Sequence, residues 1–351
     1  SVSIDTERYH SRLDIARASG TQRGFSIMMM RAFLGRTGLA AWLSAVAVGG
    51  GSMTVEAAAP RVETQAPGFY RAKLGDFELT ALLDGTVPLE LDKLMTGIKP
   101  ARVNALLTAE HLPAKVETSI NAYLINTGSK LILVDAGSGE TFGPGAGHLV
   151  SNLRAAGYAP EQIDDILITH AHFDHSGGLV VAGQKVFPNA VVHVDKHDVD
   201  YWLDPANEAK APEESKALFQ NARKVLSPYV EAGRLVPFEG DTELAPGIRT
   251  LSTHGHSPGH AFFVAESQGQ KIVFWGDVMH AGAVQFAEPS ATVRFDSDSK
   301  AAAAQRAKAY AEAAREGYWV GVAHVSFPGL GHVRAQGKGY TWVPVNYSAL
   351  K

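Results

Sequence analysis

The sequence contains no cysteine among its 351 residues. This absence excludes disulfide bonds, catalytic thiolates and cysteine-based zinc sites, so any transition-metal site must use His, Asp and Glu side chains. An excess of basic charge is also missing, because 32 Lys and Arg residues face 36 Asp and Glu residues, a formal net charge of −4. This balance argues against a protein that binds nucleic acids by general electrostatic attraction.

Long hydrophobic runs are scarce as well. The run LAAWLSAVAV at 39–48 is too short to span a membrane, follows a basic segment at 28–36 and precedes small residues that end at Ala57. This order predicts a secretory signal peptide over residues 28–57, cleaved after Ala57, and a periplasmic or secreted protein without a membrane span. Residues 1–27 do not begin with Met and are interpreted as an over-extended or non-native leader. The alternative for the apolar run is an N-terminal helix of the mature fold.

From residue 60 onward the sequence has no linker, charge block or repeat, which predicts one large domain over residues 60–351. Strand-like and helix-like segments are mixed along it, as is typical of an α/β protein or a layered α/β/α fold. The predicted helices cover Leu149–Ala156 before Gly157, Glu213–Val225, and Ala301–Glu316 with Ser299 as N-cap and Gly317 at the end. The predicted strands are Phe77–Leu83, Asn121–Asn126, Leu131–Asp135, Ile166–Thr169, Val191–Asp195, Lys271–Gly276 and Trp319–Ala323.

Polar side chains stand at the carboxyl ends of four of these strands. Asp135 closes LILVD, His170 follows ILIT, Asp277 follows IVFWG and His324 follows WVGVA. Functional sites of α/β folds gather at strand ends, on loops that a rigid sheet holds in place. These four residues are therefore candidates for one site.

The segment His170-Ala171-His172-Phe173-Asp174-His175 carries four candidate metal ligands within six residues. Imidazole and carboxylate groups suit zinc and other divalent first-row metals. Alternate residues of an extended segment point to the same side, so His170 and His172 can share one metal. Asp174 and His175, where the chain turns, can face a second metal.

HAHFDH resembles the H-x-H-x-D-H motif of the metallo-β-lactamase-fold hydrolases, and further motifs follow in the family's order. They are Asp135 in LVDAG, His256 in THGHSPGH, Asp277 in FWGD and His324 in VAHVSFPG. The resemblance implies an α/β four-layer αβ/βα sandwich in a single domain. It also implies that His170, His172 and His256 hold one metal, that Asp174, His175 and His324 hold the other, that Asp277 bridges both, and that Asp135 supports the ligands from outside the metal shell.

A closer resemblance, to the methyl parathion hydrolase branch, rests on the segments NTGSKLILVDAG, FPNAVVHVDKHD, DSDSK and GKGYTWVPVNYS. The branch also holds lactonases that act on aryl lactones such as dihydrocoumarin. It implies a secreted homodimer with two divalent ions per chain, zinc first and manganese, iron or cobalt as alternatives. The substrate-pocket positions that the resemblance points to are Phe142, Trp202, Leu94, Leu218, His280, Val293 and Phe295.

Several of these pocket positions depart from those expected of a dedicated organophosphate hydrolase. Leu94 replaces a basic residue and Leu218 an aromatic one, while His280, Val293 and Phe295 replace groups better suited to a phosphotriester. The departures favour a small-molecule lactone or aryl ester as substrate, with triester cleavage as a promiscuous activity. A dedicated methyl parathion-type hydrolase is the alternative.

The predicted reaction is attack by a metal-bridging hydroxide, with Asp277 or Asp174 handling the proton of the leaving group. The string GHSPG resembles a serine nucleophile motif, but Pro258 lacks the backbone N–H that such a site needs. Three rival functions share the metal motif: a β-lactamase, a flavo-diiron redox protein and a non-catalytic periplasmic metal-binding protein.

Overall fold

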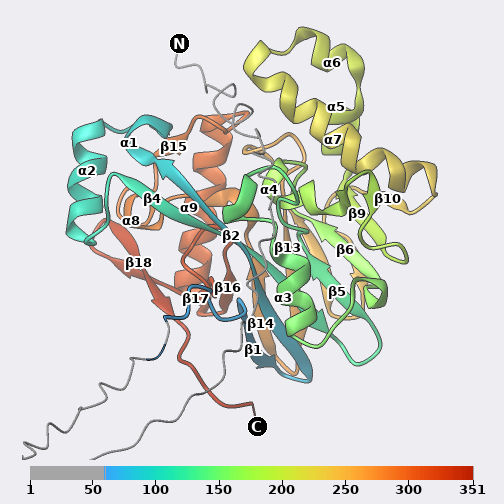
Figure 1. Cartoon of the computed structure of the whole chain (residues 1–351). Coiled ribbons are helices and arrows are strands. Elements are labelled where there is room, and N and C mark those ends of the chain that lie inside the picture. The colour runs from blue at the N-terminus through green and yellow to red at the C-terminus, as the bar shows by residue number, and fades with distance from the viewer. Residues whose placement is uncertain (1–58, 60, 351) are drawn as a thin grey trace, which may run out of the picture. The chain divides into compact units, whose positions relative to one another are not determined.

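The computed structural model describes residue 59 and residues 61–350. The predicted leader, 1–57, lies outside the described residues. The chain from Gln65 onward forms one compact unit (Figure 1).

Two seven-stranded sheets form the centre of this unit. In sheet order, the first contains β1 (Phe69–Leu74), β2 (Phe77–Glu90), β4 (Lys115–Asn126), β5 (Leu131–Val134), β6 (Asp165–Ile168), β9 (Val191–Asp195) and β10 (Leu235–Phe238). The second contains β11 (Glu243–Ala245), β12 (Ile248–Ser252), β13 (Ala261–Ser267), β14 (Gln270–Phe274), β16 (Trp319–Gly321), β17 (Leu330–Gln336) and β18 (Gly339–Pro344). Two short ribbons pair β3 (Met95–Thr96) with β15 (Thr292–Val293), and β7 (Val180–Val181) with β8 (Gln184–Lys185).

The helices are α1 (Leu91–Leu94), α2 (Pro100–Ala109), α3 (Leu149–Ala155), α4 (Phe173–Ser176), α5 (Lys196–Leu203), α6 (Pro205–Lys210), α7 (Glu213–Glu231), α8 (Gly282–Gln285) and α9 (Ser299–Glu316). Short 3-10 segments lie at Gly143–Gly145, Pro160–Gln162, Gly177–Leu179 and Gly276–Val278. In the first sheet β5, β6, β9 and β10 run parallel to one another, and in the second sheet β14 and β16 form the one parallel pair, whereas the other pairs of both sheets are antiparallel. Parallel strands have their carboxyl ends at the same edge of a sheet, and the predicted site residues come directly after these ends.

Alternation along the strands builds the layers. In β4, Tyr123 and Ile125 pack between the two sheets, whereas Leu124 packs on the other side with residues of α3 and α7. In the second sheet Phe263 packs between the sheets, and Phe262 faces a cluster that includes Tyr310 of α9. Successive side chains of a strand point to opposite faces, so both faces of each sheet are buried. The result is helices, sheet, sheet, helices: the predicted four-layer αβ/βα sandwich is confirmed.

The start of α9 corrects one sequence-based expectation. Ser299 is the first residue of the helix, and its N-cap is Asp298, whose side chain accepts a hydrogen bond from the Ala301 N–H at 2.9 Å. The predicted end is confirmed, because Gly317 adopts a left-handed conformation with φ +71°. Asp298 and Ser299 are adjacent, and both are residue types that cap helices. Only the path of the backbone decides which of them precedes the first helical turn.

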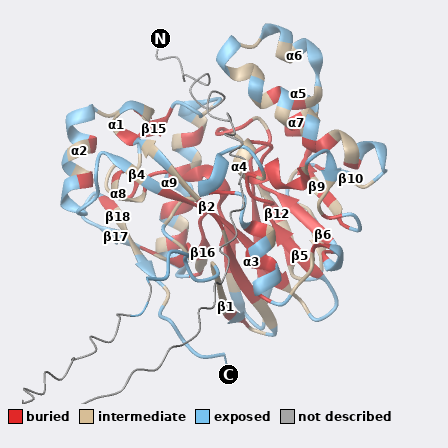
Figure 2. Cartoon of the chain, in the orientation of Figure 1, coloured by how far each residue is buried: buried red, intermediate tan, exposed pale blue. Residues whose placement is uncertain are grey.

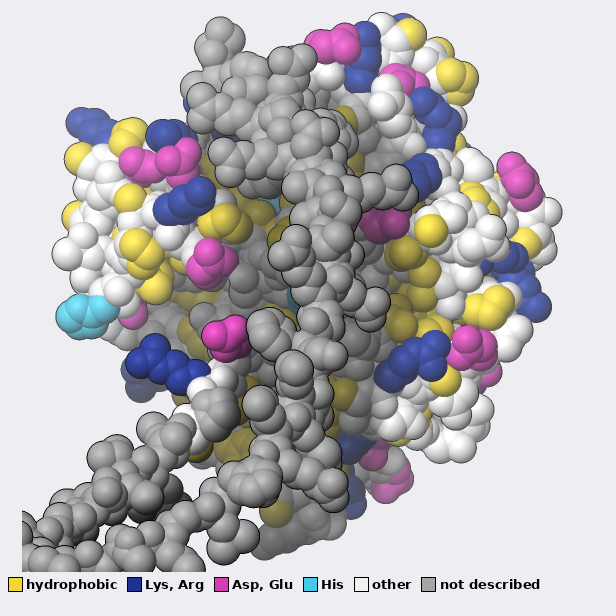
Figure 3. Space-filling view, viewed as in Figure 1, with side chains coloured by type: hydrophobic (Ala, Val, Ile, Leu, Met, Phe, Trp, Pro, Cys, Tyr) yellow, Lys and Arg dark blue, Asp and Glu magenta, His cyan; other side chains and the backbone are white. Residues whose placement is uncertain are grey.

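Buried residues concentrate on the strands, whereas the short helix α6 contributes none (Figure 2). Over the described part of the face in Figure 3, basic and acidic side chains are interspersed. Among the residues that the structure describes, no helix combines the length and apolar character needed to cross a bilayer.

Candidate metal centre

The ends of four strands deliver the predicted site residues. Asp135 follows β5, His170 comes two residues after β6, Asp277 lies in the 3-10 segment after β14, and His324 comes three residues after β16. His256 lies on the loop between β12 and β13. Residues from both sheets therefore meet in one cluster.

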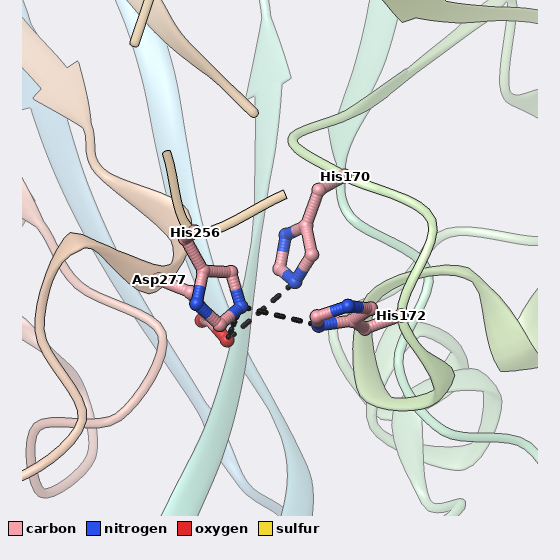
Figure 4. A group of neighbouring side chains, drawn as sticks. All are labelled: His170, His172, His256 and Asp277. Atoms are coloured by element: carbon pink, nitrogen blue, oxygen red, sulfur yellow. Dashed lines mark hydrogen bonds and ion pairs between the residues drawn. The ribbon is translucent and has the colours of Figure 1, made fainter. Parts of the chain in front are cut away.

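The first half of the cluster contains His170, His172, His256 and Asp277, all buried. Figure 4 shows the three imidazole rings and the carboxylate pointing toward one another. Asp277 Oδ2 lies 3.2 Å from His256 Nε2 and 3.5 Å from His170 Nε2. His256 Nε2 lies 3.1 Å from His172 Nδ1. These donor atoms converge on a single space.

The second half contains Asp174, His175, His324 and again Asp277. The other oxygen of Asp277, Oδ1, lies 3.0 Å from His175 Nε2 and 3.0 Å from His324 Nε2. Asp174 Oδ2 lies 3.3 Å from His324 Nε2 and 3.6 Å from His175 Nε2. The two oxygens of Asp277 thus divide between the two halves, as a bridging carboxylate would require.

Asp277 is held in place by a histidine that lies behind it. The Asp277 N–H donates to His260 Nε2 at 3.0 Å, and His260 Nδ1 lies 2.8 Å from Thr253 Oγ1. Burial lowers the pKa of His260 to about 3, so the ring is neutral and Nε2 can accept. The neighbouring Gly276 has φ +48°, and a Cβ there would lie 2.8 Å from both His260 and Thr169. Only glycine allows this close approach.

Carboxylates and a carbonyl bind the outer nitrogens of three cluster imidazoles. His175 Nδ1 lies 2.8 Å from Asp135 Oδ2, His256 Nδ1 lies 2.9 Å from Asp296 Oδ1, and His324 Nδ1 lies 2.8 Å from the Ser119 carbonyl oxygen. Such partners orient a ligating ring and set its tautomer, leaving Nε2 for the metal. Asp135 thus contacts one of the clustered rings without belonging to either half.

Sequence reasoning missed two of the supporting carboxylates, Asp296 and Asp198. Asp296 lies in the DSDSK segment, which supported the resemblance to the methyl parathion hydrolase branch but did not indicate that Asp296 contacts a ligand. Asp198, on α5, carries no local signal, because an acidic residue in a first helical turn is ordinary. Its role becomes visible only in three dimensions.

Asp198 is buried and joins two ligand-bearing loops. Its Oδ2 accepts a hydrogen bond from the N–H of Ala171, which stands between His170 and His172, at 2.8 Å. Its Oδ1 accepts hydrogen bonds from Ser257 Oγ at 2.8 Å and from the Gly259 N–H at 2.6 Å. One side chain thereby positions the loop after β6 against the loop that carries His256.

The electrostatics of the cluster separate the histidines into two groups. Burial and neighbouring imidazoles lower the pKa of His170 and His172. Burial opposes protonation of His256 as well, but hydrogen bonds to Asp277 and Asp296 outweigh it and raise its pKa to about 9. His175 and His324 follow His256, because carboxylates that include Asp277 raise their pKa against the effect of burial.

Asp277 itself is ionised. Burial disfavours its charge, but the surrounding imidazoles, His175 and His324 first among them, hold the pKa of this carboxyl well below its usual range. The ionised carboxylate can therefore accept a cation once the neighbouring imidazoles have given up their protons.

The donor set fits two divalent metal ions. Nε2 of His170, Nε2 of His175 and Oδ1 of Asp277 are buried without a hydrogen-bond partner. Buried polar atoms are rarely left unpaired, so these orphaned atoms indicate that something else satisfies them. Each half offers imidazole nitrogens and carboxylate oxygens, the donors that zinc and similar divalent ions prefer once the imidazoles are deprotonated.

Among the predicted pocket residues, His280 lies inside the cluster. Its Nε2 is 3.1 Å from Asp277 Oδ2, and its ring stacks on His324 with centroids 5.5 Å apart. Phe295 is exposed, with its ring 6.3 Å from that of His280. Val293 is buried on β15, where it pairs with Met95, next to the half-buried Leu94.

The remaining three pocket predictions lie on the side of the HAHFDH segment. Phe142 is exposed, and its ring meets Phe173 edge to face at 6.5 Å. Trp202 is buried in the core, with its ring 5.5 Å from that of His172, so it contacts the site through that ligand. Leu218 packs half-buried against the same core cluster.

Comparison with known proteins gives a family match. The model of the Metallo-beta-lactamase superfamily matches residues 116–313, more than half of the chain. The crystal structure of the hydrolase AbOPH in the β-lactamase superfamily is similar with a TM-score of 0.78 and 37% sequence identity, covering 82% of this chain and 100% of that chain.

Two further similarities are to lactonases. The structure of AidC, a dizinc quorum-quenching lactonase in complex with a product, N-hexanoyl-L-homoserine, has a TM-score of 0.75 and 27% identity, covering 80% of this chain and 99% of AidC. An N-acyl homoserine lactonase of Bacillus cereus is 27% identical over 190 residues, which is 49% of this chain and 66% of that lactonase. This chain therefore covers slightly less than two thirds of the latter relative.

Proposed function

Because this chain belongs to the metallo-β-lactamase superfamily, we propose that it is a dinuclear metal-dependent hydrolase that opens lactone rings. Two zinc ions per chain are the proposed cofactors. His170, His172 and His256 would hold one ion, Asp174, His175 and His324 the other, and Asp277 both.

The observation that carries this proposal is the geometry of Asp277. Its Oδ2 faces His170 and His256, and its Oδ1 faces His175 and His324. In a purely structural salt-bridge cluster, we would expect each carboxylate oxygen of Asp277 and each imidazole nitrogen to have a hydrogen-bond partner. Here several buried donor atoms are unpaired, which favours a catalytic metal pair over a salt-bridge cluster.

Two bound divalent ions supply a water of lowered pKa and polarise the substrate carbonyl. The residues of the chain do the rest. His260 and Asp198 fix the positions of the ligand loops, and Asp135 and Asp296 set the tautomers of two imidazoles. Of the two carboxylates considered for proton transfer, Asp174 is 19% exposed and Asp277 only 4%. Asp174 is therefore the better placed to pass a proton to the departing alkoxide.

The surroundings of the cluster support an apolar lactone as substrate. Phe142 and Phe295 are exposed aromatic residues, 37% and 40% accessible, and lie beside Phe173 and His280 respectively. Exposed aromatic rings at a polar reaction centre are suited to bind an acyl chain or an aryl ring. The lactonase relatives point the same way, and the branch resemblance adds aryl lactones such as dihydrocoumarin as candidates.

The test measures metal content first and turnover second, on the same preparation. We expect two zinc ions per chain and chelator-sensitive hydrolysis of dihydrocoumarin or N-hexanoyl homoserine lactone that exceeds methyl paraoxon cleavage in kcat/KM. If triester cleavage dominated, the protein would be an organophosphate hydrolase and not a lactonase. Nitrocefin turnover would instead support a β-lactamase, and two metals without any ester, lactone or lactam turnover would support a metal-binding protein.

The His280→Ala variant separates substrate recognition from metal binding. Its ring borders Asp277 and Phe295, so we expect unchanged zinc content and an altered ratio of kcat/KM between short-chain and aryl lactones. Loss of a zinc ion in this variant would make His280 a ligand and would reject the pocket role.

We also propose export and self-association. The basic, apolar and small-residue order of 28–57 supports cleavage after Ala57, and the branch resemblance supports a homodimer. Intact mass of the protein recovered from the periplasm of an expressing bacterium checks the cleavage. Light scattering of the purified protein checks the dimer, and a monomeric mass would reject it.

A further inference from the structure

A second group of metal-ligating side chains lies outside the residues assigned to the dinuclear centre. It consists of Asp195, His197 and His254, whose ligand atoms all lie within 4.8 Å of one another. Asp195 is the N-cap of α5, His197 stands in the first turn of that helix, and His254 is on the loop between β12 and β13. The group shares no residue with the two halves around Asp277.

The three side chains are close enough together to share one ion, and both rings are hydrogen-bonded to the carboxylate of Asp195. His197 Nδ1 lies 2.9 Å from Asp195 Oδ1, and His254 Nε2 lies 3.1 Å from Asp195 Oδ2. Two atoms bound to one ion at ~2.0–2.2 Å are about 3.0 Å apart at a right angle and about 3.4 Å apart at the tetrahedral angle. The two imidazole rings are 4.6 Å apart and inclined by 54°, so both can turn toward one point beside the carboxylate.

Accessibility and charge also suit a cation. The side chains of His197 and His254 are 50% and 35% exposed, whereas that of Asp195 is fully buried. A metal can therefore enter from solvent and keep water in its open positions. The buried carboxylate of Asp195 supplies the negative charge that attracts the cation.

We propose that Asp195, His197 and His254 form a third, solvent-facing site for a divalent first-row transition ion such as zinc. Two imidazoles and one carboxylate are the donor set that such ions accept, and the site is open on its solvent side. Because Asp195 and His197 belong to the β9–α5 corner and His254 to the β12–β13 loop, the ion links the two sheets. The same loop carries His256, so the third ion restrains a segment that also bears a ligand of the dinuclear centre.

The experiment counts zinc ions in the zinc-loaded holoprotein by equilibrium dialysis and elemental analysis. The variants are His197→Ala and His254→Ala, and His332→Ala is the control, since His332 is a partly exposed histidine on β17 outside all three groups. We expect the wild type and the control to bind one zinc ion more at saturation than either variant. Added zinc should also raise the melting temperature of the wild-type holoprotein more than that of His197→Ala.

Equal zinc counts in the wild type and His197→Ala, over the whole range in which the protein stays soluble, would overturn the proposal. The proposal would also be overturned if the variants that lose the third zinc ion always lost the two ions of the dinuclear centre as well. That pattern would indicate damage to the loop around His256. His197→Ala is the decisive variant in that case, since His197 belongs to α5 and not to that loop. The readout is a difference of one ion between two proteins, so it does not depend on the proposed lactonase activity.

Discussion

Three carboxylates organise the metal centre at the scale of single residues. Asp277 bridges the two halves, Asp198 joins the loops that carry the histidines, and Asp135 orients His175. Each is buried, and each is surrounded by hydrogen-bond donors or imidazoles that compensate for the loss of water around the carboxyl group. A buried carboxylate is costly unless it is paired, so these residues are where single substitutions should have large effects.

Asp277→Asn should abolish binding of the metal pair. The amide loses the negative charge and presents an NH₂ group to one set of imidazoles, so only one half can still find an acceptor oxygen. We expect fewer than two zinc ions per chain and a loss of lactone hydrolysis of at least ~100-fold. Elemental analysis and kinetics check this, with the exposed Glu231→Gln on α7 as control. Wild-type zinc content in Asp277→Asn would contradict the bridging role.

Asp198→Asn should weaken metal binding without contacting a metal. Both oxygens of Asp198 accept hydrogen bonds, so an amide NH₂ group would face an N–H or hydroxyl donor on one of the two loops. Substitutions of residues that support ligands usually cost ~10–100-fold in metal affinity. Zinc competition with a chromophoric chelator measures this loss, and activity should recover at high zinc.

The matched control for that variant is Asp200→Asn on the same helix. Asp200 is exposed and pairs with Lys196, and surface ion pairs contribute little. If both variants lowered zinc affinity equally, the effect would belong to α5 as a whole and not to the hydrogen bonds of Asp198.

At the scale of elements, short segments after strands place the ligands. The helix α4 has only four residues, yet it carries Asp174 and His175 and begins directly after His172. A helix this short has little stability of its own, and the Ser176 hydroxyl, which donates to the His172 carbonyl oxygen at 2.9 Å, helps to close it. Longer helices such as α9 pack on a sheet and carry none of the clustered ligands.

The N-cap of α9 offers a prediction at this scale. Asp298 accepts a hydrogen bond from the Ala301 N–H, whereas Ser299 already lies inside the helix. Asp298→Ala should therefore lower the free energy of unfolding by ~1 kcal/mol, and Ser299→Ala should change it by a few tenths at most. Chemical denaturation of the zinc-loaded protein measures both. If Ser299→Ala lowered the free energy of unfolding more than Asp298→Ala, Ser299 would be the N-cap, as the sequence pattern predicts.

At the scale of the whole molecule, the metal centre connects the two sheets. His170, His172, Asp174 and His175 follow a strand of the first sheet, and His256, Asp277 and His324 come from the second. Bound ions would therefore act as cross-links between the halves of the sandwich. Ligands that bind only the folded state stabilise it in proportion to the logarithm of their concentration, so chelation should destabilise the molecule.

Metal uptake should release protons. Carboxylates raise the pKa values of His175, His256 and His324 against the effect of burial, that of His256 to about 9, so at least the His256 ring is protonated at neutral pH in chelator-treated protein. A metal requires their neutral form. Zinc affinity should therefore rise with pH and level off above about 9. Calorimetry in buffers of different ionisation enthalpy counts the protons, and uptake without release at pH 7 would contradict the assigned protonation.

The sequence by itself determined the local part of this protein. HAHFDH places four candidate ligands within six residues, and the strands before Asp135, His170, Asp277 and His324 are where the pattern predicts them, because alternation and turn residues are local signals. The prediction missed β12, β13, β17 and β18, although each of them pairs with a strand that is next to it in the sequence.

Only the tertiary structure decided which residues support the ligands. Asp198 meets Gly259 across 61 positions, and His256 meets Asp296 across 40. No local pattern distinguishes these carboxylates from ordinary helix or turn residues. The same holds for His280 inside the cluster and for His254 beside Asp195. Contacts of this kind depend on how two sheets pack, and packing depends on the whole chain at once.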